Sequence, residues 1–223
     1  MGLLLASLAG PLIQSFEHRI SFYKKWKPLF TAIVFMMAIF IPWDVWFTHE
    51  GVWWFNDKYI SGYKFFLLPI EEWLFFIIIP FCCVFVYEVL NYTIKKDFLN
   101  KAARPFFLLL SSFLILLASV YHQQLYTFVT SIATAIVLLF FIYKNPLWKG
   151  RFLLMYLIIW FPFLLVNGVL TGGHTSEAVV NYNPEEFIGL RVFTIPIEDS
   201  IYNLLMLLMV VWAYERVKKK AEK

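Results

Sequence analysis

The sequence predicts an all-α, polytopic membrane protein with about seven transmembrane helices, and two observations support this. Hydrophobic residues make up 61% of the 223 residues and charged residues only 15%, whereas soluble domains have about 45–50% apolar and about 25% charged residues. The apolar residues also gather in runs close to the ~20 residues that a membrane-crossing helix needs. This composition excludes an ordinary globular domain, a disordered chain and a nucleic-acid-binding protein.

Six apolar runs are long enough, or nearly so, to cross a bilayer. A seventh, Gly2–Phe16, contains Pro11 and would reach only about 22 Å as a helix, against a hydrocarbon core of about 30 Å. It lacks the basic n-region of a signal peptide, so we expect a short first helix there. The longer runs are Leu29–Phe47, Leu67–Leu90, Pro105–Tyr121, Leu125–Tyr143, Phe152–Leu170 and Ile195–Tyr214.

The basic residues predict the orientation of the helices. If the N-terminus lies outside, only three of the 19 Lys and Arg residues fall in outer segments: Lys58, Lys64 and Arg191. Since cytoplasmic loops carry the excess of basic residues, we expect an integral protein of the inner (cell) membrane with a cytoplasmic C-terminus. The inner residues are Arg19, Lys24, Lys25, Lys27, Lys95, Lys96, Lys101, Arg104, Lys144, Lys149, Arg151, Arg216, Lys218, Lys219, Lys220 and Lys223.

Two stretches of the chain match each other at a constant offset of 127 residues. This predicts a 3+1+3 parallel internal repeat, with a first three-helix repeat at 1–100, a spacer helix at 101–124 and a second repeat at 125–223. Such repeats suggest a pseudo-twofold axis along the membrane normal, with a site between the halves. The matches join Phe55-Asn56 to Tyr182-Asn183, Gly62 to Gly189, Lys64 to Arg191, and Pro69-Ile70-Glu71-Glu72 to Pro196-Ile197-Glu198-Asp199; Asp44-x-x-x-Thr48 resembles Asn167-x-x-x-Thr171.

Each repeat places an acidic pair at the start of a helix. Proline and acids are common in the first turn of any helix, so capping alone is one interpretation. Apolar residues precede each proline, however, and a carboxylate carried into hydrocarbon costs about 2.5–3.5 kcal/mol on insertion scales. We therefore predict a catalytic role for the four acids: Glu71, Glu72, Glu198 and Asp199.

Further polar residues near these motifs are candidate supporting or substrate-binding residues. Asp44 and Asn167 stand near outer helix ends, where capping is the alternative. Lys64 and Arg191 precede each proline by five residues, and either extend to the membrane interface or hold the ionised member of each acid pair.

Several other side chains have interfacial interpretations. Glu88 is expected near the inner interface, beside Lys95. Tryptophans favour the membrane–water interface, although some could instead line a cation-stabilising pocket. The outer tryptophans are Trp43, Trp46, Trp53 and Trp54.

No sequence motif points to a cofactor or a metal, and we expect neither. Cys82 and Cys83 are adjacent in an apolar run, and the four histidines lack metal-site spacing. No two acids have the spacing of a Mg²⁺–diphosphate site, and there is no GxGxxG fingerprint. The last predicted helix has no lysine for a retinal Schiff base.

The acidic motifs resemble those of the membrane-integral, non-flavin lycopene cyclase family. The likeness covers nearly the whole chain; its clearest segments are Pro69–Phe76, Gly189–Arg191, Ile195–Asp199, Phe22–Lys27 and Trp43–Thr48. The family occurs as two three-helix subunits in some bacteria and as one fused chain in archaea and fungi. This chain departs from the family in its short first helix and at Ser200, where an aromatic residue is common.

This resemblance implies a carotenoid-biosynthesis isomerase that converts the linear ψ ends of lycopene or γ-carotene into β-ionone rings, giving β-carotene, without a redox cofactor. Its partners would be the lipophilic carotenoid and the lipid bilayer. The product's ring number and ring type, and the substrate's length, stay open. Glu71 and Glu198 would protonate C2, Glu72 and Asp199 would hold the proton or accept it back, Asp44 and Asn167 would support them, and Lys64 and Arg191 would set their ionisation.

Two other functions compete with a cyclase. Small carriers share the 3+1+3 plan, so a proton-coupled transporter is one alternative; against it, the acids cluster at the outer helix ends and the spans have little polar lining. A non-enzymatic membrane scaffold, with acids that only cap helices, is the other.

Overall fold

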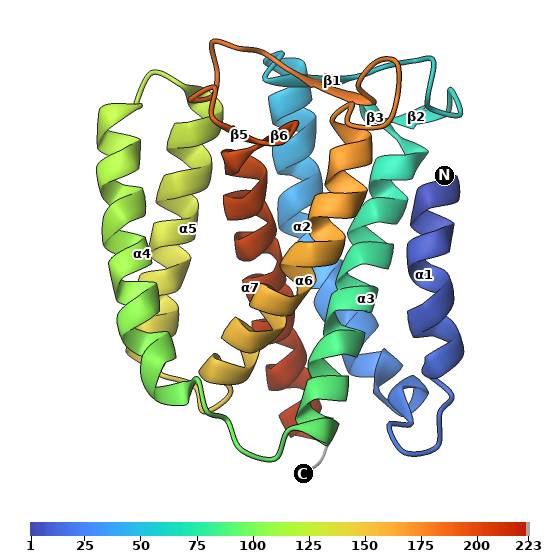
Figure 1. Cartoon of the computed structure of the whole chain (residues 1–223), viewed down its shortest axis with the longest axis vertical. Coiled ribbons are helices and arrows are strands. Elements are labelled where there is room, and N and C mark those ends of the chain that lie inside the picture. The colour runs from blue at the N-terminus through green and yellow to red at the C-terminus, as the bar shows by residue number, and fades with distance from the viewer. Residues whose placement is uncertain (222–223) are drawn as a thin grey trace. The chain divides into compact units, whose positions relative to one another are not determined.

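The computed structural model describes residues 1–221 and is mostly helical (Figure 1). Six of its helices are long and apolar enough to cross a membrane, and a shorter apolar helix, α1, precedes them. The predicted all-α membrane architecture is therefore confirmed. The helices are α1 (Gly2–Gln14), the 3₁₀ turn η1 (Phe22–Lys25), α2 (Trp26–His49), α3 (Ile70–Thr93), α4 (Asn100–Val120), α5 (Leu125–Lys144), α6 (Lys149–Leu170) and α7 (Ile197–Ala221).

Six short strands connect the helices. They form three two-stranded antiparallel pairs, β1 with β4, β2 with β3, and β5 with β6. The strands are β1 (Trp53–Phe55), β2 (Lys64–Phe65), β3 (Leu68–Pro69), β4 (Val180–Tyr182), β5 (Arg191–Val192) and β6 (Ile195–Pro196).

The membrane orientation predicted from the basic residues stays a prediction, and Lys223 lies outside the described residues.

The chain divides into two compact units, each built from separate stretches. The first unit comprises Met1–Trp46, Ile60–Lys96 and the described chain from Met206 onward; the second comprises Phe47–Tyr59 and Asp97–Leu205. These units group residues by packing. The domains expected from the repeated sequence, 1–100, 101–124 and 125–223, were defined in a different way, and they stay a prediction.

In the first unit, α1 packs along α3 (Figure 1). Aromatic rings fill the inner part of this unit: Phe22 makes edge contacts with Phe81 and Phe85, each with ring centroids 5.5 Å apart. Edge-to-face packing is a favoured geometry for such pairs. α1 continues through Pro11 to Gln14, so the proline does not end the short first helix.

Glu88 of α3 is at the centre of a buried ion-pair cluster in the first unit. Its side chain is 1% exposed and pairs with both Lys25 and Lys218. The Tyr214 hydroxyl also donates to Glu88 Oε1 at 2.8 Å. Lys95 was the expected neighbour, but the cations that pair with Glu88 come from η1 and α7. The expected position of Glu88 near the inner interface stays a prediction.

In the second unit, α4 and α5 form an antiparallel hairpin (Figure 1). The aromatic rings of Phe107, Phe141 and Phe152 pack together from α4, α5 and α6. Asn100 fixes the connection to α6, because its amide donates to the Leu147 carbonyl and accepts from Lys149. These contacts tie the three helices into one unit.

The predicted 127-residue repeat is visible in local conformation. The hairpins β2–β3 and β5–β6 share a register, with Lys64 opposite Pro69 and Arg191 opposite Pro196. Their tips place Phe66 and Phe193 at positive φ, 50° and 58°, a conformation that bulky residues seldom adopt. The same backbone hydrogen bond joins each hairpin to its helix, from Ile70 to Tyr63 at 2.9 Å and from Ile197 to Leu190 at 3.1 Å.

The ribbon of β1 and β4, which lies within the second unit, has a twofold-symmetric register. Trp54 pairs with Asn181, its counterpart at the 127-residue offset. The flanking backbone bonds are reciprocal: Asn56 donates to the Val179 carbonyl at 2.8 Å, and Asn183 donates to the Val52 carbonyl at 2.9 Å. Exchanging the two repeats therefore leaves this pairing unchanged, as the predicted pseudo-twofold requires at this point.

A polar link joins two loops of the second unit outside the membrane-spanning helices. Asn56 donates to Glu177 Oε2 at 2.9 Å, and Lys58 lies 3.4 Å from Oε1. The Asn56 hydrogen bond, followed by the Lys58 charge, lowers the pKa of Glu177. A carboxylate with a lowered pKa contributes stability above its unfolded pKa of about 4.3, and loses that contribution as pH falls through the folded pKa.

We therefore expect the loop at residues 174–179 to loosen below about pH 4.3. Hydrogen exchange of this segment, corrected for the intrinsic pH dependence of exchange, measures the effect. Glu177→Gln should abolish the acid-induced loosening. An identical pH response in the variant would show that other groups control this loop.

Candidate active site

The acidic pair of the second repeat begins α7 as a buried site. The β5–β6 hairpin ends at Pro196, whose fixed φ suits a helix start, and Glu198 and Asp199 follow in the first turn. Glu198 is 0% exposed and Asp199 is 7% exposed. Two neighbouring carboxyl groups at this depth need polar partners, because burying an unpaired charge is costly.

Asp199 accepts hydrogen bonds from three side chains on three different elements. Tyr126 of α5 donates to Oδ1 at 2.6 Å. Asn167 of α6 and Tyr182 of β4 donate to Oδ2 at 2.7 Å and 2.8 Å. A carboxylate has about four acceptor sites, so these three donors leave one site, on Oδ1, open to accept a proton.

Glu198 has a different and incomplete set of partners. Its Oε1 accepts from the Thr127 hydroxyl at 2.6 Å and from the Ile188 backbone N–H at 3.0 Å. Its other oxygen, Oε2, is buried and has no hydrogen-bond partner among the described residues. A proton on Oε2 would have no acceptor among residues 1–221, so this oxygen suits a group that donates a proton to a bound molecule.

Aromatic rings pack beside the acids. The Tyr126 and Tyr182 rings stack 6.0 Å apart with an interplanar angle of 7°. Trp53 presents edge contacts to Tyr126 at 5.2 Å and to Tyr202 at 6.1 Å. Trp53 is only 6% exposed, so it is buried within this aromatic cluster. Aromatic faces attract positive charge, so this wall suits a cationic intermediate.

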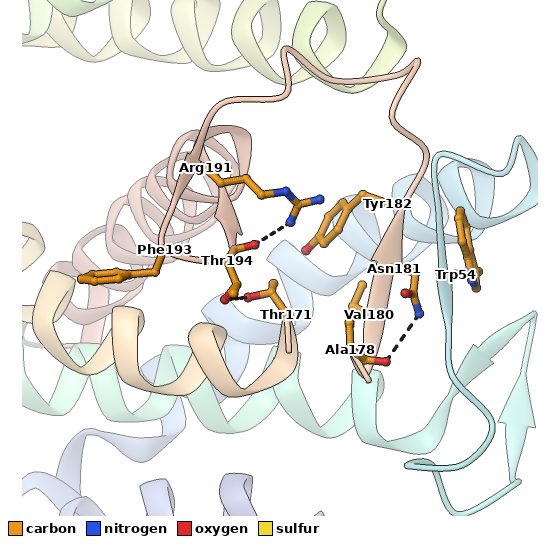
Figure 2. A pocket seen from close by; sticks show the side chains of 9 residues that line it. All are labelled: Trp54, Thr171, Ala178, Val180, Asn181, Tyr182, Arg191, Phe193 and Thr194. Carbon is orange, nitrogen blue, oxygen red and sulfur yellow. Dashed lines mark hydrogen bonds between the residues drawn. The ribbon is translucent and has the colours of Figure 1, made fainter. Parts of the chain in front are cut away.

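An open pocket of about 340 Å³ lies at the loop end of the second unit (Figure 2). Tyr182 connects it with the acids, because its ring lines the pocket and its hydroxyl reaches Asp199. Thr171 and Thr194 share a hydrogen bond of 2.7 Å along the wall, as the dashed line in Figure 2 shows. The pocket therefore has both polar and aromatic walls.

Arg191 lines the same pocket and is held by its neighbours. Its guanidinium carbon lies 5.6 Å from the Tyr182 ring centroid and 4.9 Å from that of Phe187, and an N–H donates to the Thr194 carbonyl. Arg191 thus contacts a tyrosine that binds Asp199. An effect of Arg191 on the ionisation of the acids stays a prediction.

The first repeat presents its acids differently. Glu71 accepts from the Ser61 backbone N–H at 3.0 Å, which is the counterpart of the Ile188–Glu198 bond at the same offset and the same length. Glu71 and Glu72 are half-buried, whereas Asp44 on α2 is 2% exposed. Lys64 is exposed on β2. The second repeat therefore holds the more deeply buried acid pair.

Comparison with known proteins places this chain in a family. The family model described as lycopene cyclase matches residues 1–90 and 123–217. The chain belongs to the lycopene cyclase family. Both acidic motifs lie inside the matched segments, and the unmatched residues between them include α4. The resemblance found in the sequence is thus confirmed.

One curated relative is a bifunctional lycopene cyclase/phytoene synthase from Aspergillus oryzae, which is 28% identical over 96 residues. The aligned part covers 43% of this chain and only 16% of that protein. No solved structure matches the chain. In this cyclase-family chain, no three His, Cys, Asp or Glu side chains gather as metal ligands within residues 1–221.

The structure brings together some of the predicted residues and adds others. Asn167, Glu198 and Asp199 lie together, with the Asn167 amide donating to Asp199; their catalytic and supporting roles stay predictions. Sequence reasoning missed Tyr126 and Thr127, which hold the two acids. Their signal was weak, because a tyrosine at the start of an apolar run is also typical of an interfacial anchor.

Proposed function

We propose that this chain cyclises the ψ ends of lycopene or γ-carotene to β-ionone rings, as an isomerase of carotenoid biosynthesis. The observation that carries the proposal is the pair of buried neighbouring carboxyl groups with opposite environments. Glu198 Oε2 lacks a partner within the described residues, whereas Asp199 accepts from three donors. One group thus suits proton donation and the other proton acceptance.

In the first step, Glu198 protonates C2 of the ψ end group. The C1–C2 double bond supplies the electron pair, and a tertiary cation forms at C1. The C5–C6 double bond then attacks C1, forming the C1–C6 bond and moving the cation to C5. The wall of Trp53, Tyr126 and Tyr182 stabilises this charge and keeps water from capturing it.

In the last step, Asp199 removes the proton from C6. The C–H electron pair becomes the C5–C6 double bond of the β ring, so one proton is gained and one is lost without net redox change. Asn167 keeps Asp199 in place, and Arg191 keeps the Tyr182 ring in place. Glu71 and Glu72 are the corresponding candidate acid and base of the first repeat, supported by Asp44 and Lys64.

We propose further that the protein lies in the cell membrane with its C-terminus in the cytoplasm, because the basic residues fall mostly on one side of the predicted topology. Topology reporters fused after residue 223 and inserted at the 174–179 loop should report opposite sides of the membrane. A shared side would overturn this orientation.

The direct test is pigment analysis of a lycopene-accumulating bacterial host that expresses the full chain alone. We expect lycopene to be converted to γ- or β-carotene, identified by chromatography and absorption spectra. Membrane fractionation confirms that the protein is present. Unchanged lycopene with the protein in the membrane would overturn the proposal that this chain is a self-sufficient cyclase of lycopene.

A further inference from the structure

Asp199 is fixed by a set of three donors that we call the Asp199 clamp: Tyr126, Asn167 and Tyr182. The donors come from α5, α6 and β4, and they occupy both carboxylate oxygens at 2.6–2.8 Å. Contacts from three elements allow the carboxylate little rotation about its χ angles. The clamp therefore defines the position of each oxygen as well as the charge of the group.

The position of a base matters in this reaction because the final cation can lose any of three kinds of proton. A cation at C5 has C–H bonds on C6, on C4 and on the C18 methyl group. Removing the C6 proton gives the β ring, removing the C4 proton gives the ε ring, and removing a C18 proton gives the exocyclic γ ring. In each case the electron pair of the broken C–H bond forms the new double bond, so atoms and electrons balance for all three products.

We propose that the Asp199 clamp determines which of these protons is removed, with the Tyr126 hydroxyl as its principal member. This inference rests on the proposed function, in which Asp199 is the base. Tyr126 is the only clamp donor to Oδ1 among the described residues, and its bond is the shortest of the three. Tyr126 is thus a positioning residue that determines product specificity through Asp199.

The neighbouring residue provides an internal contrast. Thr127 donates to Glu198, the acid that acts before the C5 cation exists. Loss of the Thr127 hydroxyl should therefore slow cyclisation without altering the ring type. Two adjacent residues of α5 thus control different steps, rate through Thr127 and ring type through Tyr126.

The phenol ring of Tyr126 can be kept while its hydroxyl is removed. The ring is 2% exposed and packs against Tyr182 and Trp53, so Tyr126→Phe preserves these contacts. Tyr156→Phe is the matched control, because Tyr156 is also buried and its hydroxyl donates to the Ser200 carbonyl at 2.7 Å, not to an acid. Thr134→Val is the control for Thr127→Val, since Thr134 is buried on the same helix and its hydroxyl donates to the Thr130 carbonyl, not to an acid.

The experiment measures the ratio of β, ε and γ rings formed from lycopene by full-length variants in membranes. For Tyr126→Phe, we expect the ratio of minor to major ring type to rise about tenfold, since a hydrogen bond to a charged group is worth roughly one factor of ten or more. For Thr127→Val, we expect a lower rate with an unchanged ratio, and Thr127→Ser should restore the rate. Both controls should keep the wild-type ratio.

Each outcome separates the inference from the function on which it rests. A Tyr126→Phe enzyme that is merely slower, with the wild-type ring ratio, would overturn the clamp as the determinant of ring type. An Asp199→Asn enzyme with full activity would instead overturn Asp199 as the base, and with it the proposed function of this site. Should Tyr126→Phe fail to accumulate in membranes, Tyr182→Phe tests the same clamp through Oδ2, and an unchanged ratio in that variant would equally overturn the inference.

Discussion

Replacing Glu198 with glutamine should reduce cyclase activity by about 10²–10⁴-fold, the usual contribution of a general acid. The amide can still accept from Thr127 and the Ile188 N–H at the Oε1 position, so the local packing is preserved. What is lost is the proton at Oε2, the oxygen without a partner among the described residues. The measurement is the rate of lycopene conversion in isolated membranes, normalised to the amount of protein.

Two further variants serve as comparisons for Glu198→Gln. Glu185→Gln removes a carboxylate from an exposed position of the same loop region and should leave the rate unchanged. Glu71→Gln alters the half-buried counterpart in the first repeat and should cost less activity than Glu198→Gln. Full activity in both Glu71→Gln and Glu198→Gln would refute the assignment of these glutamates as acids.

Glu88→Gln should lower the free energy of unfolding by about 3–5 kcal/mol, because removing the carboxylate of a buried ion pair leaves its lysine partners uncompensated. The carboxylate serves two lysines at once and also accepts from Tyr214. Lys25 and Lys218 have only 31% and 20% of their side chains exposed, so water replaces the lost charge poorly.

The effect is measured by heating the protein in detergent and recording the fraction that stays monodisperse at each temperature. Glu17→Gln is the control, since the Glu17 side chain is half exposed and its carboxylate lies near the exposed side chains of His18 and Arg19. Adding Lys25→Met to Glu88→Gln removes one of the two uncompensated charges and should recover part of the lost stability. An unfolding temperature equal to that of the native protein in Glu88→Gln would contradict the ion-pair account.

The helices and hairpins could be predicted because hydropathy and repetition are local in sequence. Apolar runs located all six long helices, although the ends shifted where apolarity alone gives no boundary: α2 begins at Trp26 and α4 at Asn100. The matched prolines predicted the starts of α3 and α7. Two segments of similar sequence tend to adopt the same local structure. The backbone hydrogen bonds to Glu71 and Glu198, which are equal in length, agree with this.

The partners of the acids could not be predicted, because they depend on which distant residues the fold brings together. Tyr126 is 73 residues from Asp199 in sequence, and nothing in its own neighbourhood marks it as a donor. Glu88 illustrates the same limit: its nearest lysines in sequence lie beyond the end of α3, while its actual partners come from far along the chain. Charge pairing in an apolar protein is decided by tertiary packing rather than by sequence proximity.

The register of the β1–β4 ribbon bears on how such a chain can arise. When a pairing maps onto itself under exchange of its two strands, one surface is complementary to its own copy, which is the defining property of an isologous contact in a homodimer. A single three-helix ancestor carrying this strand would already possess its dimerisation edge before any gene fusion. In a single chain the two strands need not be identical, and at the centre of the ribbon they are not, since Trp54 lies opposite Asn181.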